Sequence, residues 1–319
     1  MRRLLVLLLS LLLMTATAAC GGDSGKADED VDMGQTIKGL DVTGAFGEEP
    51  KVSVDPAVEV DKPQTEVLTK GEGNPVVENK KAMFNIFLAK GSDGEKLYSS
   101  ADQGTPTQVA MKENEFFQVI IDGLVGKPQG SRVAIAATVK DVWGNAGAPQ
   151  LKLKKKDTVL FVLDVLSVEP TDVMSGPEGD DVAPPATAPV VQESDGKVTG
   201  FDFSKAPRKA PSKLQVIPLV EGDGPAAKAG RLVTFDYYGA VWGSEKAFDS
   251  SFDRGEPVPF GVGVNGLIPA WDKVIPGLKQ GSRVLIIAPP ADGYGAQARP
   301  GIPANSTLTF VVDVLGVDA

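Results

Sequence analysis

The chain has 319 residues, enough for about two domains at ~150 residues each. It contains one Cys and no His, which excludes Ser-His-Asp and Cys-His catalysis, His-ligated zinc and an intramolecular disulfide. Asp and Glu number 42 against 32 Lys and Arg, a net charge of −10, and an acidic chain without a basic stripe is a poor candidate for nucleic-acid binding. We therefore expect no metal, cofactor or nucleic-acid partner.

The N-terminus is typical of an exported protein. Arg2 and Arg3 precede an apolar run over 4–14, which is shorter than the ~20 residues of a transmembrane helix but fits a signal peptide. The segment Thr-Ala-Ala-Cys-Gly ending at 21 resembles a bacterial lipobox, which implies cleavage before Cys20 and lipidation of Cys20. We then expect the protein to be extracytoplasmic and anchored at the outer face of the cell membrane by its acyl chains. The alternative is a free thiol in an ordinary signal peptide.

The chain repeats itself at an offset of about 150 residues. Gln129–Val133 is identical to Gln280–Val284, and Phe161–Leu166 closely matches Phe310–Leu315. Such ordered agreement predicts two copies of one domain. The Pro-rich, acidic stretch between the copies is typical of an extended linker. The expected segments are a signal peptide at 1–19, an acidic disordered tether at 20–41, a first domain at 42–168, a linker at 169–197 and a second domain at 198–319.

The second copy has the pattern of a sheet with one short helix. Strands are predicted over 232–238, where side chains alternate between two faces, and over 281–288, which is rich in Val and Ile. A third is predicted over 307–315, whose alternation indicates a sheet packed on one side. Leu267, Trp271 and Val274 have helical spacing. Pro269 is tolerated in the first turn, and Pro276 ends the helix. The 36 Gly and 24 Pro also favour short strands and many turns. The expected fold class is α+β, an antiparallel sheet with a short helix against it.

Several segments of this copy occur in the order and near the spacing of a known family. The segments are V-T-F-D-Y-Y-G at 233–239, F-D-S-S at 248–251 with D-R at 253–254, G-L-I-P-A-W at 266–271, G-S-R at 281–283, Y-G-A at 294–296, P-G-I-P at 300–303 and T-L-T-F at 307–310. Together they resemble an FKBP-type peptidyl-prolyl cis-trans isomerase domain over roughly 214–317. The resemblance implies a fold in which a twisted antiparallel sheet curves around a short helix.

The implied chemistry suits a chain without His. Rotation about an X-Pro bond must cross a barrier of ~18–20 kcal/mol, and its transition state is a twisted amide that has lost resonance. No covalent bond breaks, so the enzyme only has to bind the twisted form better than the planar one. Apolar surroundings favour the twisted form because twisting reduces the amide dipole.

The resemblance implies a set of site residues in the second copy. Trp271 would form the floor under the proline ring, the Tyr294 hydroxyl would bond a substrate carbonyl, and Asp249, held near Tyr237 and Arg254, would lie at the rim. Taken singly, Phe310 and Ile268 could be core residues and Asp249 a turn residue. The implied catalytic residues are Tyr237, Asp249, Trp271 and Tyr294, and the implied substrate-binding residues are Phe248, Arg254, Leu267, Ile268, Ile302 and Phe310.

This sequence departs from the family pattern in both copies. In the second, Arg299 stands where many members have His, and Val258 where many have an aromatic residue. In the first, the scaffold remains, but of the aligned site residues only Phe310 is retained, as the core-like Phe161. We therefore expect a folded domain with little or no isomerase activity. Its role would be to bind unfolded chain or a partner, or to space the second domain from the membrane. The replacements along the chain are Ile86 for Tyr237, Leu97 and Tyr98 for Phe248 and Asp249, Gln103 for Arg254, Ile120 for Trp271 and Trp143 for Tyr294.

The resulting functional expectation is a peptidyl-prolyl cis-trans isomerase that helps exported proteins to fold. Its partners would be unfolded or extended polypeptides that contain proline, with macrolide inhibitors as further candidate ligands. One alternative is a non-catalytic peptide-binding chaperone. Another is a solute-binding lipoprotein of a transporter, although such proteins normally alternate strands with long helices.

Overall fold

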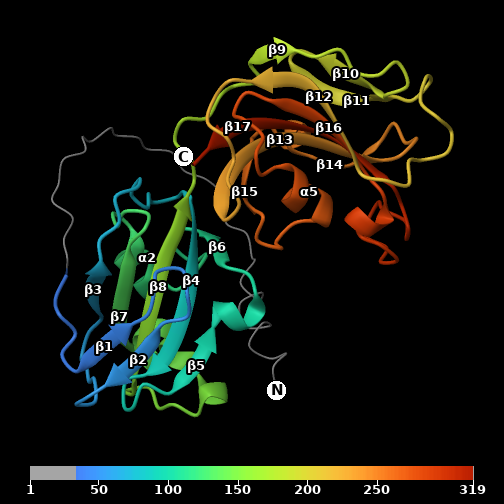
Figure 1. Cartoon of the computed structure of the whole chain (residues 1–319). Coiled ribbons are helices and arrows are strands. Elements are labelled where there is room, and N and C mark those ends of the chain that lie inside the picture. The colour runs from blue at the N-terminus through green and yellow to red at the C-terminus, as the bar shows by residue number, and fades with distance from the viewer. Residues whose placement is uncertain (1–33, 319) are drawn as a thin grey trace. The chain divides into compact units, whose positions relative to one another are not determined.

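The computed structural model describes residues 34–318 (Figure 1). The predicted signal peptide and Cys20 therefore lie outside the described residues. Of the described residues, 34–103 and 109–166 form one compact unit, and 104–108 and 167–318 form a second. Within the described part of the chain, every helix is too short or too polar to span a bilayer.

The first unit is built on a six-stranded sheet in the order β3-β7-β8-β4-β5, with β6 also pairing with β4. The strands β1 and β2 form a separate antiparallel hairpin. Its elements are β1 (Leu40–Thr43), β2 (Lys51–Val54), β3 (Gln64–Thr69), β4 (Lys81–Lys90), β5 (Lys96–Ser99), β6 (Thr107–Ala110), α2 (Gln118–Leu124), β7 (Arg132–Thr138), α3 (Val139–Trp143) and β8 (Thr158–Val168).

The second unit has a seven-stranded sheet in the order β14-β13-β17-β16-β12-β9, with β15 pairing with β13. Leaving out β9, its strands follow the same order as those of the first unit. The strands β10 and β11 again form a separate hairpin. Its elements are β9 (Gly179–Asp181), β10 (Val190–Ser194), β11 (Lys197–Asp202), β12 (Gln215–Gly222), β13 (Arg231–Val241), β14 (Ala247–Ser250), α4 (Ser251–Arg254), β15 (Val258–Val262), α5 (Pro269–Val274), β16 (Arg283–Ala288) and β17 (Leu308–Val317).

Each unit is an antiparallel sheet with short helices, as the α+β prediction requires, but the sheet of the second unit is covered on both faces. Side chains of successive strand residues point to opposite faces. Phe235 and Tyr237 of β13 pack in the core that contains α5. Tyr238 packs on the other face with Val198 and Phe201 of β11. The predicted one-sided sheet is therefore wrong, because the β10–β11 hairpin covers the second face.

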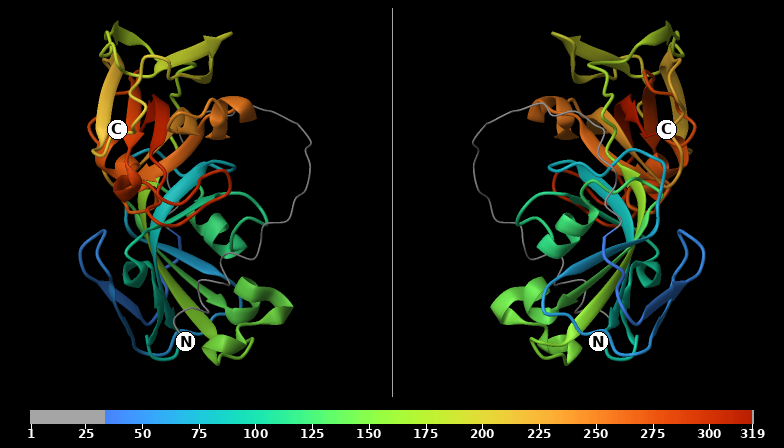
Figure 2. Two further views of the ribbon diagram at one scale, coloured as in Figure 1. Left: turned by 90° about the vertical axis from the view of Figure 1, so that its right-hand side faces the viewer. Right: turned by 90° about the vertical axis from the view of Figure 1, so that its left-hand side faces the viewer.

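The first unit has a comparable hairpin. Leu40 of β1 and Val52 of β2 pack against Ala134, Ala136 and Leu160 of the sheet. Figure 2 shows this blue hairpin on the side of its sheet opposite to α2. In both units, the hairpin that precedes β3 or β12 along the chain thus supplies a second apolar layer.

These hairpins correct two of the predicted boundaries. The predicted tether at 20–41 is wrong over 34–41, since Ile37 is buried and Leu40 already begins β1. The predicted linker at 169–197 contains β9, which pairs with β12, and β10, which pairs with β11. Composition alone suggested extended chain. The structure instead shows that β9 satisfies backbone groups at the edge of β12, which would otherwise stay unpaired.

A buried Arg–Asp pair connects each sheet with its hairpin. In the second unit, Arg283 Nε donates to Asp313 Oδ1 at 2.5 Å, and the same guanidinium pairs with Glu193 of β10. Burial raises the pKa of Asp313, although Arg283 opposes that shift. In the first unit, Arg132 donates to Asp164 at 2.6 Å and to backbone carbonyls of the β1–β2 turn. Removing one partner of such a buried pair leaves an uncompensated charge.

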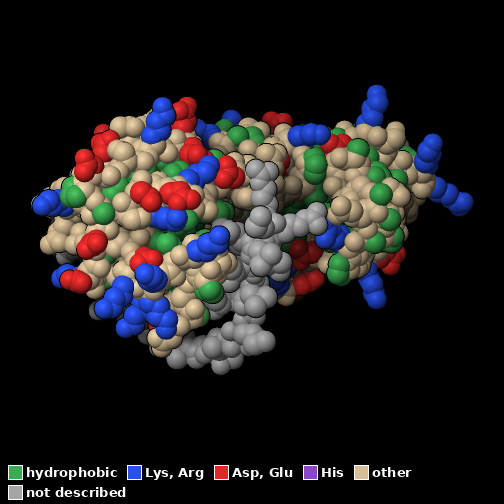
Figure 3. All heavy atoms as spheres, turned by 90° about the horizontal axis from the view of Figure 1, so that it is seen from below, with side chains coloured by type: hydrophobic (Ala, Val, Ile, Leu, Met, Phe, Trp, Pro, Cys, Tyr) green, Lys and Arg blue, Asp and Glu red, His purple; other side chains and the backbone are tan. Residues whose placement is uncertain are grey.

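The surface carries charges of both signs. In the view of Figure 3, Lys and Arg side chains are interspersed with Asp and Glu, and apolar side chains lie between them.

Candidate active site

The helix α5 brings Trp271 against the sheet of the second unit. Pro269 stands at the start of the helix, where its missing N–H costs nothing, and follows Ile268 in an extended conformation. The backbone N–H of Trp271 donates to the backbone carbonyl of Ile268 at 3.0 Å. The helix ends at Val274, two residues before Pro276, as the sequence predicts.

Trp271 is held by side-chain packing rather than by a side-chain hydrogen bond. Its indole meets Phe235, Tyr237 and Phe310 edge to face, with centroid distances of 5.6, 5.2 and 5.5 Å. The side chain is 4% exposed, and its Nε1 is buried without a hydrogen-bond partner. Each such ring pair adds about 0.5–1.5 kcal/mol beyond area burial, so packing fixes the orientation of the indole.

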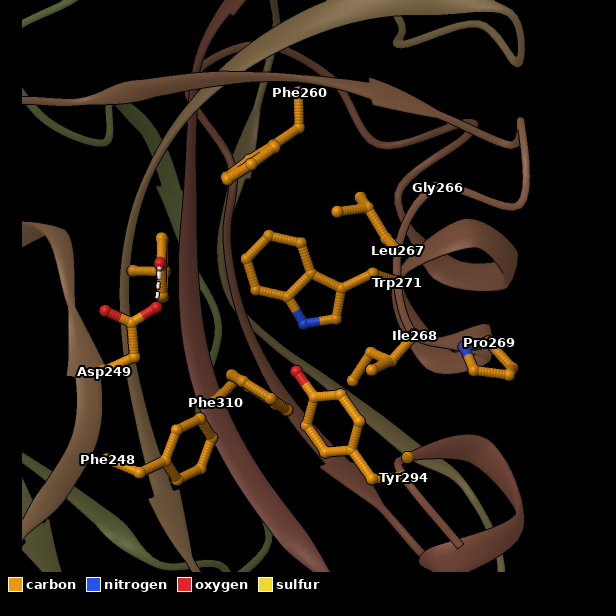
Figure 4. A pocket seen from close by; sticks show the side chains of 12 residues that line it. Phe248, Asp249, Phe260, Gly266, Leu267, Ile268, Pro269, Trp271, Tyr294 and Phe310 are labelled. Atoms are coloured by element: carbon orange, nitrogen blue, oxygen red, sulfur yellow. Dashed lines mark hydrogen bonds between the residues drawn. The ribbon is translucent and has the colours of Figure 1, made fainter. Parts of the chain in front are cut away.

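A pocket of about 420 Å³ opens above this indole (Figure 4). Aromatic and aliphatic side chains from β13, β14, β15, α5 and β17 form its walls. The Tyr294 ring lies beside Ile268, with its hydroxyl directed toward Trp271. The lining residues are Tyr237, Phe248, Asp249, Phe260, Gly266, Leu267, Ile268, Pro269, Trp271, Gly293, Tyr294 and Phe310.

The polar side of the pocket is a cluster of three connected side chains. The Tyr237 hydroxyl donates to Asp249 Oδ2, a bond drawn dashed in Figure 4, and Arg254 Nη2 donates to the Tyr237 oxygen at 2.9 Å. Arg254 also pairs with Asp249 Oδ1. Burial, followed by the bond to Asp249, raises the pKa of Tyr237 to about 12. The phenol therefore stays protonated at neutral pH and holds the carboxylate of Asp249 at the pocket wall.

A serine fixes the backbone beneath this cluster. Ser251 Oγ accepts a hydrogen bond from the Tyr237 N–H at 2.7 Å and donates to Asp236 Oδ1 at 2.7 Å. The same arrangement occurs in the first unit, where Ser100 Oγ accepts from the Ile86 N–H at 3.0 Å. Because the first unit keeps this bond without the site residues, the serine belongs to the fold of the β13–β14 corner rather than to the chemistry.

The structure brings eight of the ten predicted pocket residues into one lining. Of the other two, Arg254 reaches the site through Asp249 and Tyr237, whereas Ile302 is buried in the adjoining core and is not part of the lining. Phe260 was missed. It lies opposite Val233 in the β13–β15 pairing. Its ring forms a pocket wall two residues after Val258, and Val258 is the position at which the sequence lacks the aromatic residue of many FKBP-type domains. Alternation along β15 is the signal that could have identified it.

In the first unit, the corresponding walls touch each other. Ile86 and Ile120 replace Tyr237 and Trp271 and are buried. Phe117 and Trp143, at the positions of Ile268 and Tyr294, are in contact at 5.7 Å between ring centroids, and Phe116 packs on Phe117 at 5.1 Å. These aromatic and aliphatic contacts stand in the first unit where the second unit has its indole floor and its Tyr237–Asp249–Arg254 cluster.

Comparisons with known proteins agree with this site. The sequence profile described as "FKBP-type peptidyl-prolyl cis-trans isomerase" matches residues 224–315. FK506-binding protein 1 of Debaryomyces hansenii is 45% identical over 111 residues, which are 34% of this chain and 98% of that protein. Peptidyl-prolyl cis-trans isomerase Fkbp12 of Drosophila melanogaster is 42% identical over 107 residues, 33% of this chain and 98% of that protein.

A crystal structure of FkpA from Escherichia coli aligns with 34% identity over 35% of this chain and 52% of that chain, with a TM-score of 0.31. The two sequence relatives are covered almost completely, and the profile match lies within the second unit, where the pocket is found. The chain belongs to the family of FKBP-type peptidyl-prolyl cis-trans isomerases.

Proposed function

We propose that the second unit isomerises X-Pro bonds by binding the twisted amide over Trp271. The proline ring would lie on the indole, between the walls formed by Phe248, Phe310 and Tyr294. These walls exclude water from the amide, so the loss of amide dipole on twisting costs less than it does in solution. The convergence of these rings on one pocket is the observation that supports this proposal.

The polar groups of the pocket would act by orienting the substrate. The Tyr294 hydroxyl projects into the pocket (Figure 4) and would donate a hydrogen bond to a substrate carbonyl. Asp249 is already bonded by Tyr237 and Arg254, so it would present a fixed negative potential to the amide rather than accept a proton. Any group that is bound more strongly in the twisted state than in the planar state lowers the barrier, by tenfold in rate for each 1.4 kcal/mol.

A protease-coupled assay of a proline peptide tests this assignment in the full chain. Wild-type protein should accelerate isomerisation, and Trp271→Leu should lose at least tenfold in kcat/KM. Trp143→Leu removes the only tryptophan of the first unit and should leave the rate unchanged. A near-zero rate of the wild type would favour the non-catalytic chaperone. A full rate of Trp271→Leu would contradict the role of Trp271 as the floor of the site.

We further propose that this isomerase assists exported proteins from a membrane anchor at Cys20. The lipobox-like segment and the signal peptide pattern support this proposal, and Cys20 is the only cysteine of the chain. A bacterium that expresses the full chain and is fed a labelled fatty acid should yield labelled protein in its membrane fraction. Cys20→Ser should lose both the label and the membrane association, and a label that persists in Cys20→Ser would contradict the anchor.

The same pocket would accept macrolides of the FK506 type, a proposal supported by the name of the yeast relative. Such a compound would compete with the peptide for the surface over Trp271. Isomerase activity should therefore fall with increasing macrolide, and raising the peptide concentration should restore it. Inhibition that is independent of peptide concentration would place the compound elsewhere.

A further inference from the structure

A tight turn holds Arg299 at a fixed place beside the pocket. Arg299 and Ile302 exchange two backbone hydrogen bonds of 2.9 Å each. Between them, Gly301 has a φ of 76° and follows Pro300, which is the pattern of a type II turn. Gly301 lies so close to Phe248 that an added Cβ would be 3.2 Å from the Phe248 Cβ. The backbone from which the Arg299 side chain emerges is therefore braced against a pocket residue.

The guanidinium of Arg299 lies over a ring that lines the pocket. Its Cζ is 5.6 Å from the centroid of the Tyr294 ring, within the range of a cation–π contact. Its Nη2 also donates to Gln297 Oε1 at 3.1 Å. The exposed guanidinium is thus held beside Tyr294, a pocket residue whose hydroxyl projects toward Trp271.

Other cations around the pocket are neutralised, and Arg299 is not. Arg254 pairs with Asp249, and Lys273 pairs with Asp292 at 2.5 Å. Among the described residues at this rim, Arg299 is the cation whose hydrogen-bond partner is a neutral amide. The rim therefore carries one uncompensated positive charge in a chain whose net charge is −10.

We propose that Arg299 forms a subsite for a carboxylate side chain next to the substrate proline, an inference that rests on the isomerase site proposed above. One residue of extended chain spans about 3.3–3.6 Å. A residue next to a proline bound over Trp271 would therefore lie near Tyr294 and near the guanidinium of Arg299 that contacts the Tyr294 ring. A guanidinium can bind a carboxylate with two parallel hydrogen bonds. The site would therefore prefer Glu or Asp beside the proline over Gln or Lys at the same position.

The test uses the full chain and two sets of peptides. In one set Glu, Gln or Lys precedes the proline, and in the other it follows the proline. In wild-type protein we expect kcat/KM for Glu to exceed that for Gln by about two- to fivefold in at least one set, the size of an exposed ion pair. This ratio should approach one in Arg299→Gln, and Arg299→Glu should prefer the Lys peptide.

Arg208→Gln is the matched control, since it makes the same change at an exposed arginine outside the pocket lining. It should keep the wild-type ratio of Glu to Gln, and about 0.5 M salt should reduce that ratio, since salt screens exposed charges. If the ratio of kcat/KM for Glu to Gln is the same in wild type and Arg299→Gln, or falls to one in Arg208→Gln, this inference alone is wrong. If the wild type accelerates none of the peptides, the proposed function and this inference are both wrong.

Discussion

The hydrogen-bonded cluster at the pocket makes a quantitative prediction for Tyr237→Phe. This change removes the hydroxyl that donates to Asp249 and accepts from Arg254 at 2.9 Å, while the ring stays packed on Trp271. A hydrogen bond to a charged group contributes about 1.5–3 kcal/mol. We expect the free energy of unfolding of the second unit to fall by about that amount.

The pH dependence gives a second readout of the same change. An unfolded tyrosine ionises near pH 10, whereas Tyr237 in the folded protein keeps its proton up to a pKa of about 12. Between these values the unfolded state has released a proton that the folded state retains, so stability falls as the pH rises. The shifted pKa of Tyr237 should lower the free energy of unfolding by at most about 1.4 kcal/mol at pH 11 relative to pH 8. Tyr237→Phe should lack this loss.

Urea unfolding of wild type and variants at pH 8 and pH 11 measures both effects. Tyr238→Phe is the control for the first effect. The Tyr238 hydroxyl donates to the backbone carbonyl of Glu245 at 3.1 Å, and hydrogen bonds between neutral groups contribute only about 0.5–1.5 kcal/mol. If Tyr237→Phe were as stable as wild type and lost the same stability between pH 8 and pH 11, the cluster would not hold the site together.

Two further changes probe the structure around the pocket. Arg283→Met leaves Asp313 buried without its partner and should destabilise the second unit by about 3–5 kcal/mol, as measured by thermal unfolding. The additional change Asp313→Leu should recover part of that loss. A double variant no more stable than the single one would contradict this reasoning. Gly239→Ala would place a Cβ 2.8 Å from Phe248 and 2.9 Å from Phe310, so both rings must shift. We expect kcat/KM to fall several-fold in the peptide assay while the protein stays folded, and an unchanged kcat/KM would show that these rings can move freely.

The sequence alone predicted the features that depend on local chemistry and spacing. Alternation along 232–238 predicted a strand, which the structure extends to Arg231–Val241, and Pro269 and Pro276 bounded a helix that carries Trp271. Both follow from backbone geometry, because side-chain period and the missing N–H of proline act within a few residues. The residues of the candidate pocket were predictable for a different reason: their motifs occur in the order of a known family.

Only the tertiary structure showed which distant segments share a surface. The stretch at 169–197 looks like a linker because it is rich in proline and acid, yet it contains strands that pair with β12 and β11. Likewise, nothing in the local sequence shows that Arg299 lies over Tyr294. Composition reports what a segment can do by itself, whereas the unpaired edge of a strand or the open face of a ring exists only after the chain has folded.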